Sequence, residues 1–337
     1  MPNVCKNCFS DRELIGFITS QSKFDNCSFC NLKDVECLPI EELFDFFKEL
    51  LGNFKKTDDG ETLKSKLQGN WSLFSSLDIG YNILNSVIDK IETEITNADE
   101  KVDFSDEILD NVNYWDKLKN QLIWENRYLT DINYLTDELG WDGFFGSQIA
   151  LSPDAKLYRA RIHQSSSESR YAIDKMFCPP KDKATAGRAN PIGIPFLYLS
   201  DNDKTVLYEI RASYLDEVSI GTFMLKEELT SEILISDFTE SITIFHPSRV
   251  SERIKATLLK QKISADLSKP MRRYDSELDY IPTQFICEFI KVYTGVQGIK
   301  FRSSLHTVGN NIVIFNQEIM RCIEVDKVKI RKVSIFI

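Results

Sequence analysis

Apolar residues between positions 40 and 146 recur at the three- and four-residue spacing of amphipathic helices. The clearest stripe lies in the range 79–95 and consists of Ile79, Ile83, Val87, Ile88, Ile91 and Ile95. The same spacing predicts helices over 41–54, 60–74 and 114–139, with an acidic, turn-rich link at 96–110. Pro39 ends the preceding segment. The pattern therefore predicts an all-α domain over residues 39–147.

The second half of the chain changes to a period of two. Residues 156–163 alternate strictly, so Tyr158, Ala160 and Ile162 share one strand face while Arg159, Arg161 and His163 share the other. An apolar run at 194–199 and two more within 298–315 also predict strands. Residues 282–293 predict a helix with Pro282 in its first turn and a buried stripe that includes Phe285, Phe289 and Tyr293. We expect an α+β chain with a mixed or antiparallel sheet in its C-terminal part.

Candidate chemistry gathers in residues 187–211, which place Arg188, Asn190, Tyr198 and Glu209 around one strand and one helix start. Asp201 or Asp203 is expected to cap that helix, and Gly187 and Gly193 allow a turn or a close approach to a ligand. Taken alone, Arg188 or Glu209 would be interpreted as an exposed side chain. The arginines of 156–163 change this interpretation, because such a strand faces either water or an anion-binding cleft. A Rossmann site is not predicted, since no G-x-G-x-x-G occurs.

In this order and spacing the pieces resemble the RES domain, named for its Arg, Glu and Ser. The resemblance rests on Leu157-Tyr158-Arg159, Pro179-Pro180, the G-R-x-N-x-x-G run at 187–193, Tyr198-Leu199, the T-x-x-x-E run at 205–209, and G-I-x-F-x-S at 298–303. Phe301 stands where a Tyr is common, and Ser304 follows Ser303, so either serine could have the family role. The insertion at 220–280 matches no part of the pattern. The resemblance assigns residues 148–337 to a RES domain.

The resemblance implies a fold like the diphtheria-toxin class of ADP-ribosyltransferases, acting on NAD. It assigns Arg159 and Arg188 to the phosphates, for which guanidinium forks are suited, and Tyr198 to stacking on nicotinamide. Glu209 would contact the ribose hydroxyls and the positive charge that develops as the glycosidic bond breaks. Ser303 would contact the carboxamide or a strand end. Second-rank candidates are Arg161, His163 and Asn190.

The expected function is cleavage of the nicotinamide–ribose bond by hydrolysis or phosphorolysis, in a toxin or anti-phage effector restrained by an antitoxin or another regulatory protein. Two alternatives stay open within the fold: a mono-ADP-ribosyltransferase with a protein target, and a non-catalytic module that binds NAD or a partner. The complete set of site residues argues against the second. A zinc-dependent nucleic-acid binder is a further alternative.

The amino-acid composition and the net charge favour some of these functions over others. With 42% hydrophobic residues in 337, the chain is expected to bury sizeable cores. A formal net charge of −10 disfavours general binding to nucleic acid or to anionic membranes. There is no run of about 18 uncharged apolar residues, so no membrane span is expected. The N-terminal segment does not resemble a secretory signal, and a cytoplasmic protein is predicted.

Four of the eight cysteines form a C-x2-C-x18-C-x2-C pattern: Cys5, Cys8, Cys27 and Cys30. Two such pairs predict a tetrahedral zinc site over residues 1–38, and four protein ligands make it structural rather than catalytic. Disulfides would require an oxidising compartment that nothing else indicates. Cys37, Cys178, Cys287 and Cys322 are scattered and are expected to be buried.

The helical segment 39–147 weakly resembles the HEPN-type domains that precede some RES domains, through its position and the N-W-S-L-F-S run at 70–75. Active nucleases of that class use an R-x4-6-H motif, and no histidine occurs between Leu32 and Ala150. We therefore expect a scaffold, a homo-oligomer surface or a docking site rather than a nuclease.

Overall fold

A computed structural model describes residues 2–146, 148–165, 169–240, 242–270 and 277–332. The chain divides into two compact units, each assembled from two stretches of sequence. Unit 1 comprises Met1–Trp115 with Ser241–Leu259, and unit 2 comprises Asp116–Glu240 with Lys260–Ile337. These units do not correspond one to one to the three predicted domains, so the predicted boundaries at 38 and 147 stay a prediction. Among the described helices, none has the length and apolar character that a bilayer span needs.

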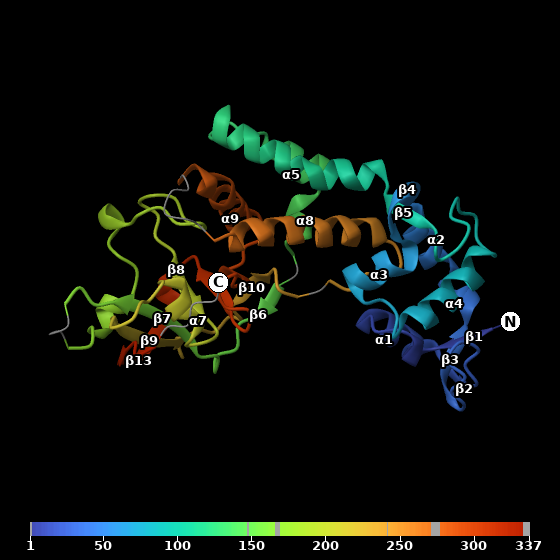
Figure 1. Cartoon of the computed structure of the whole chain (residues 1–337), viewed down its shortest axis with the longest axis horizontal. Helices are drawn as coiled ribbons and strands as arrows, with labels where there is room; N and C mark the ends of the chain where they lie inside the picture. The colour runs from blue at the N-terminus through green and yellow to red at the C-terminus, as the bar shows by residue number, and fades with distance from the viewer. Residues whose placement is uncertain (1, 147, 166–168, 241, 271–276, 333–337) are drawn as a thin grey trace. The chain divides into compact units, whose positions relative to one another are not determined.

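Unit 1 combines short strands with helices (Figure 1). In chain order its elements are β1 (Asn3–Cys5), a 3-10 turn (Lys6–Cys8), α1 (Arg12–Gln21), β2 (Lys23–Asp25), β3 (Val35–Pro39), α2 (Phe44–Gly52), β4 (Phe54–Thr62), α3 (Leu63–Trp71), α4 (Leu77–Ile88), β5 (Lys101–Phe104) and the start of α5 (Asp106–Trp124). The first residues of α8 (Val250–Ser268) also belong to this unit. β3 pairs antiparallel with both β1 and β2, and β4 pairs antiparallel with β5.

The range 39–147 is mainly helical but not all-α, because β4 and β5 form a two-stranded sheet within it. The helix predicted from residue 60 begins only at Leu63, where Thr62 Oγ1 accepts a hydrogen bond from the Ser65 amide. Gly60 has a φ of +146°, a conformation that suits glycine and interrupts helix propagation. The helix predicted over 79–95 ends at Ile88, and the one predicted over 114–139 starts earlier, at Asp106, and ends at Trp124.

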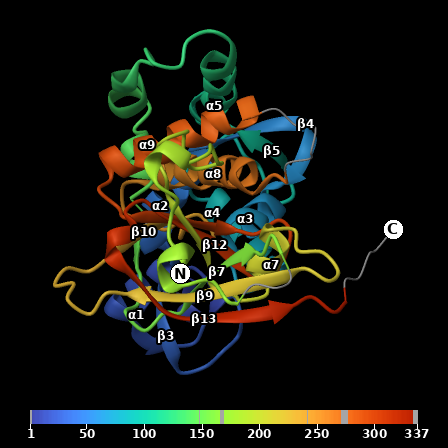
Figure 2. The same cartoon turned by 90° about the vertical axis from the view of Figure 1, so that its left-hand side faces the viewer.

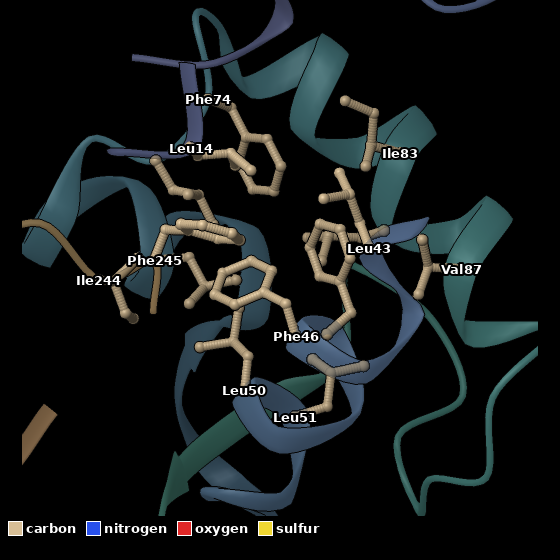
Figure 3. Packing of buried hydrophobic residues seen from close by; sticks show 14 of the residues in the cluster. Leu14, Leu43, Phe46, Leu50, Leu51, Phe74, Ile83, Val87, Ile244 and Phe245 are labelled. Atoms are coloured by element: carbon tan, nitrogen blue, oxygen red, sulfur yellow. The ribbon is translucent and has the colours of Figure 1, made fainter. Parts of the chain in front are cut away.

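The apolar core of unit 1 includes residues from the insertion that the sequence pattern could not place. Ile244 and Phe245 are buried among α1, α2 and α4 (Figure 3), and the ring centroid of Phe245 lies 5.0 Å from that of Phe46. Asp11 fixes the inserted backbone, since its Oδ2 accepts the amides of Ile244 (2.7 Å) and Phe245 (3.1 Å). The other oxygen, Oδ1, caps α1 at Glu13 and Leu14. One buried carboxylate therefore links the first helix to residues more than 230 positions away.

Unit 2 is built on an eight-stranded sheet in the order β13-β9-β7-β8-β12-β11-β10-β6. Its strands are β6 (Gln148–Ala150), β7 (Leu157–Ile162), β8 (Leu197–Ser200), β9 (Glu217–Leu225), β10 (Leu234–Asp237), β11 (Gly298–Arg302), β12 (Asn310–Ile314) and β13 (Met320–Lys329). Its helices include α6 (Trp141–Phe144), α7 (Thr205–Glu209), α9 (Ile281–Tyr293) and the end of α8. β10 and β11 are parallel, and the other neighbours are antiparallel. This mixed sheet confirms the predicted α+β class.

Two features of unit 2 determine the surroundings of the site: the pairing of β7 with its neighbours, and helix α9. β9 runs between β13 and β7 (Figure 2), and β7 pairs with it through six residues. By contrast, β7 and β8 pair only at Tyr158 and Ser200. Helix α9 forms as predicted, with Pro282 in its first turn and Ile286, Phe289 and Ile290 buried, although Tyr293 is exposed. β7 and β8 are thus paired at one position only, whereas β7 pairs with β9 along its whole length.

Candidate active site

A cavity of about 330 Å³ lies in unit 2, beside the single pairing point of β7 and β8. Its lining comes from strands, loops and helix ends that are far apart in sequence. The lining residues are Arg159, Ala160, Gly187, Arg188, Tyr198, Leu199, Ser200, Val206, Glu209, Ile210, Leu267, Ser268, Tyr280, Phe301, Ser304, Leu305 and Asn311. Four of the predicted residues, Arg159, Arg188, Tyr198 and Glu209, therefore share one cavity.

Arg159 has a largely desolvated guanidinium that lies close to Arg161 and Cys178. It lies on β7 opposite Gly221 of β9, and its Nη1 is buried with no hydrogen-bond partner in the described part of the chain. Burial, together with the charge of Arg161, lowers the pKa of Arg159 to about 10. The side chain is still protonated at neutral pH, and a buried charge is unfavourable unless it is paired. The arrangement favours the binding of an anion in the cavity.

Arg188 is held by helices on both sides of its loop. Its Nη1 donates to the Leu267 carbonyl at the end of α8 (2.7 Å), and burial lowers its pKa. The first turn of α9 fixes the backbone, since Thr283 Oγ1 donates to the Arg188 carbonyl (2.7 Å) and Gln284 Nε2 to the Gly187 carbonyl (2.8 Å). A guanidinium has five N–H donors, so Arg188 has further donors for a ligand after its one contact with the Leu267 carbonyl.

The hydroxyl of Tyr198 is engaged within the protein. Its Oη donates to Asn190 Oδ1 (2.8 Å) and accepts from the Ala189 amide (3.0 Å). Burial raises the pKa of Tyr198, so the phenol is neutral. Asn190 is buried and does not line the cavity; it also donates to the carbonyls of Thr185 and Pro191. Tyr198 thus contributes to the cavity while Asn190 supports the loop that contains Arg188.

Glu209 is fixed through one of its two carboxylate oxygens. Oε1 accepts from Ser303 Oγ (2.7 Å) and from Asn311 Nδ2 (2.8 Å). Ser303 is buried, and its Oγ also accepts the amides of Leu305 (3.2 Å) and His306 (3.1 Å). Ser303 therefore holds both the carboxylate and the loop after β11. The neighbouring Ser304 lines the cavity instead, so the two serines have different positions.

The helix that contains Glu209 is not capped as predicted. The N-cap position is Lys204, which makes no side-chain cap, and Asn202 Oδ1 accepts the amides of Lys204 (2.9 Å) and Thr205 (3.3 Å) in the turn before the helix. Asp201 is used elsewhere, because its carboxylate accepts both the amide and the Nδ2 of Asn310. The expectation that Asp201 or Asp203 is the cap is wrong: the acceptor next to the helix start is an asparagine, which serves as well as aspartate.

The other two second-rank candidates, Arg161 and His163, also lie outside the cavity. Arg161 Nη2 donates to the Phe177 carbonyl (2.7 Å), and Arg161 lines a separate pocket with Tyr171 and Lys175. His163 is buried, its Nε2 lies 2.8 Å from Ser219 Oγ, and its ring stacks on Tyr171 at 4.4 Å between centroids. The predicted shared face of Arg159, Arg161 and His163 therefore does not bring all three to one site.

Asn311 and Tyr280 are cavity residues that sequence reasoning did not identify. For Asn311 there was a signal, since two asparagines precede the apolar run of β12 and polar residues at a strand start often face a site. Tyr280 lies at the end of the unplaced insertion and gave no comparable signal.

The four predicted cysteines of unit 1 form one cluster whose sulfur atoms all lie within 4.8 Å of one another. The Sγ–Sγ distances are 3.7 Å for Cys5–Cys8, 3.4 Å for Cys5–Cys30 and 3.5 Å for Cys8–Cys27. Tetrahedral zinc with Zn–S bonds of about 2.3 Å requires sulfurs roughly 3.8 Å apart, close to these values. The donor set fits a four-thiolate metal site.

Comparison with known proteins places the larger part of unit 2 in a family. No curated protein matches the sequence. A crystal structure of the M. tuberculosis MbcT–MbcA toxin–antitoxin complex contains a chain that is 11% identical, with a TM-score of 0.32, over 56% of this chain and 92% of that one. Residues 156–333 match the family model described as the RES domain, which is more than half of the 337 residues. The chain belongs to the RES domain family.

Proposed function

We propose that this chain cleaves NAD at the bond between nicotinamide and ribose. The observation that supports this most is a cavity with two charged sides: a carboxylate held by two donors, and a guanidinium whose buried Nη1 has no hydrogen-bond partner in the described residues. NAD offers the complementary pair of features. Its diphosphate is anionic, and its glycosidic carbon becomes positive as the bond breaks.

Arg159 and Arg188 are proposed to bind the diphosphate. Both line the cavity, and burial lowers the pKa of each, which indicates that both guanidinium groups have lost much of their water. Charge-assisted hydrogen bonds to phosphate oxygens would offset that loss. Arg159, whose Nη1 has no partner in the described part of the chain, gains most from such a ligand.

Glu209 is proposed to stabilise the transition state. When the bond from ribose C1′ to the nicotinamide nitrogen breaks, the electron pair leaves with nicotinamide, which departs neutral, and C1′ becomes oxocarbenium-like. A carboxylate a few ångströms away stabilises that charge more in the transition state than in the ground state. The oxygen of water, or of phosphate in the phosphorolytic variant, then bonds to C1′ and its proton passes to solvent. Tyr198 is proposed to stack on nicotinamide, and Ser303 to orient Glu209.

The test is nicotinamide release from NAD, followed by chromatography, for the wild-type protein, Glu209→Gln and Glu227→Gln. Glutamine keeps an oxygen for Ser303 and Asn311 but removes the charge, so we expect turnover to fall by about 100-fold or more with NAD affinity nearly unchanged. Glu227, an exposed partner of Arg321 outside the cavity, is the matched control and should behave as wild type. Wild-type protein that releases no nicotinamide, or Glu209→Gln with undiminished turnover, would refute the proposal. If label from NAD becomes attached to a protein, the proposed activity is mono-ADP-ribosylation instead of hydrolysis.

We further propose that the four-cysteine cluster holds one structural zinc ion. Support comes from the four sulfur atoms within 4.8 Å and from the burial of Cys5, Cys8 and Cys27. Four thiolates leave no open coordination position, so the ion would stabilise the fold rather than react. Metal analysis should find one equivalent per chain; less than half an equivalent in protein purified without chelators would contradict the assignment.

A protein that consumes NAD in its own cell needs restraint, and we propose an antitoxin or another regulatory protein as the partner. The helical segment 39–147 is proposed to mediate association, with this partner or between copies, and to lack ribonuclease activity because it contains no histidine. RNA cleavage by Glu209→Gln protein would contradict the second statement. A monomer that captures no partner from its native host would contradict the first.

A further inference from the structure

We infer that Asn311 is a positioning residue for Glu209, and that it selects which oxygen of the carboxylate meets the substrate. The inference rests on the proposed function. Its basis is the pair of hydrogen bonds on a single atom: Asn311 Nδ2 (2.8 Å) and Ser303 Oγ (2.7 Å) both donate to Glu209 Oε1. No described residue donates to Oε2, which is left for the ribose.

The chemistry of the two groups fixes the direction of this contact. An ionised carboxylate only accepts hydrogen bonds, so the amide of Asn311 must present its NH2 group and not its oxygen. Each carboxylate oxygen has two lone pairs, and two donors use both lone pairs of Oε1. The terminal torsion of a glutamate is otherwise broad. Two donors, one on β12 and one just after β11, therefore hold the carboxylate plane, which a single serine would leave free to rotate.

The position of Asn311 in the sheet gives this contact its rigidity. β12 lies between β8 and β11, and Asn311 pairs with Ser200 on one side and Phe301 on the other. Glu209, by contrast, is the last residue of α7, a helix of five residues. A group on an interior strand is located more precisely than one at the end of a short helix. Asn311 thus fixes the position of the Glu209 carboxylate relative to the sheet.

The neighbouring Asn310 provides a matched control. It also lies on β12, and its Nδ2 also donates to a carboxylate, Asp201 Oδ2, at 2.7 Å. Neither Asn310 nor Asp201 lines the cavity. Asn310→Leu therefore removes a contact of the same kind and length from the adjacent residue, without touching the proposed site.

The experiment compares Asn311→Leu and Asn310→Leu in nicotinamide release, each in the wild-type and the Glu209→Gln background. Leucine has nearly the shape of asparagine and donates nothing. We expect Asn311→Leu to lower kcat by roughly 10-fold to 100-fold, with KM changed by less than about 3-fold, because the loss concerns orientation and not binding. Asn310→Leu should keep the wild-type kcat. In the Glu209→Gln background Asn311→Leu should have little further effect, since a residue that acts through Glu209 cannot act without its charge.

The outcomes separate the two claims. If the wild-type protein releases nicotinamide and Asn311→Leu matches it, the inference about Asn311 is overturned and the proposed function stands. Equal losses from Asn311→Leu in both backgrounds would also overturn it, because they would indicate a structural effect independent of Glu209. If the wild-type protein releases no nicotinamide, the proposed function falls, and the role of Asn311 in that reaction falls with it.

Discussion

Replacing Gly187 by alanine should disturb the loop that contains Arg188. A Cβ at this position would lie 2.6 Å from Tyr198 Oη and 2.7 Å from Asn190 Oδ1, closer than real Cβ atoms approach other heavy atoms. These two atoms are hydrogen-bonded to each other, and Tyr198 Oη also accepts the Ala189 amide. The added carbon must therefore displace Tyr198, Asn190 or the loop itself.

The cost follows from the hydrogen bonds that would be lost. Two partly buried hydrogen bonds converge on Tyr198 Oη, and a buried polar group left without its partner costs about 1–3 kcal/mol. A total of about 2–4 kcal/mol is expected, since the loop relaxes in part. In a domain of this size 1 kcal/mol corresponds to a Tm change of roughly 2–4 °C, so the melting temperature should fall by about 4–16 °C. The affinity for NAD should fall as well, because Arg188 is the next residue.

Thermal unfolding followed by circular dichroism, with NAD titration of the same samples, measures both effects. Gly143→Ala is the control, because nothing lies within 4 Å of a Cβ at Gly143 in the same unit. A second variant tests the cause. Tyr198→Phe removes the closest clashing atom, so Gly187→Ala combined with Tyr198→Phe should lose less than the sum of the single losses. A Gly187→Ala protein that melts with the wild type, or strictly additive losses, would refute this reasoning.

Three further predictions concern charge and metal. Arg159→Gln should weaken NAD binding by ~1.5–3 kcal/mol in calorimetry on a Glu209→Gln background, because glutamine cannot make the charge-assisted hydrogen bond that the guanidinium would make to the diphosphate; undiminished affinity for NAD in the variant would contradict this. Cys27→Ser should lose most of the bound zinc and lower the melting temperature, whereas Cys287→Ser should keep the metal. Burial lowers the pKa of Lys260 from 10.5 to about 8, so between these values the unfolded chain binds more protons and stability rises with pH. Urea unfolding should show this rise in the wild type and its loss in Lys260→Met; identical pH profiles would count against it.

The fold could be predicted from the sequence where the signal is local. The strands around the site and helix α9 have clear periods, and the RES motifs are short and well separated. β4 was missed because its F-K-K-T-D-D-G-E-T sequence has few apolar residues and its partner, β5, lies some forty residues later. The insertion could not be placed because the apolar run that contains Ile244 and Phe245 is too short to predict an element, and its role appears only in contact with residues such as Phe46.

For the site, sequence spacing indicated which residues would converge but not how each would be used. Arg159 and Glu209 were identified from motifs, and both line the cavity. The exclusion of Arg161 and His163 depends on where β7 and β8 part, which strand periodicity does not encode. The difference between Ser303 and Ser304 likewise depends on the path of the loop after β11. Side-chain partners that are 90 to 110 residues apart, such as Glu209 with Asn311, have no local signature.

Because the two units alternate along the sequence, the order of synthesis determines when each unit can be completed. Residues 116–240 stand between the two parts of unit 1, and at about 5–20 residues per second they take roughly 6–25 s to translate. Throughout that interval Ile244 and Phe245 are not yet synthesised. Their amides cannot donate to Asp11, and the hydrophobic core of unit 1 is incomplete. The cavity is completed later still, because Phe301 and Asn311 are among its last residues to be made. A nascent chain that does not yet contain Asn311 therefore cannot hold Glu209 through both of its hydrogen-bond donors.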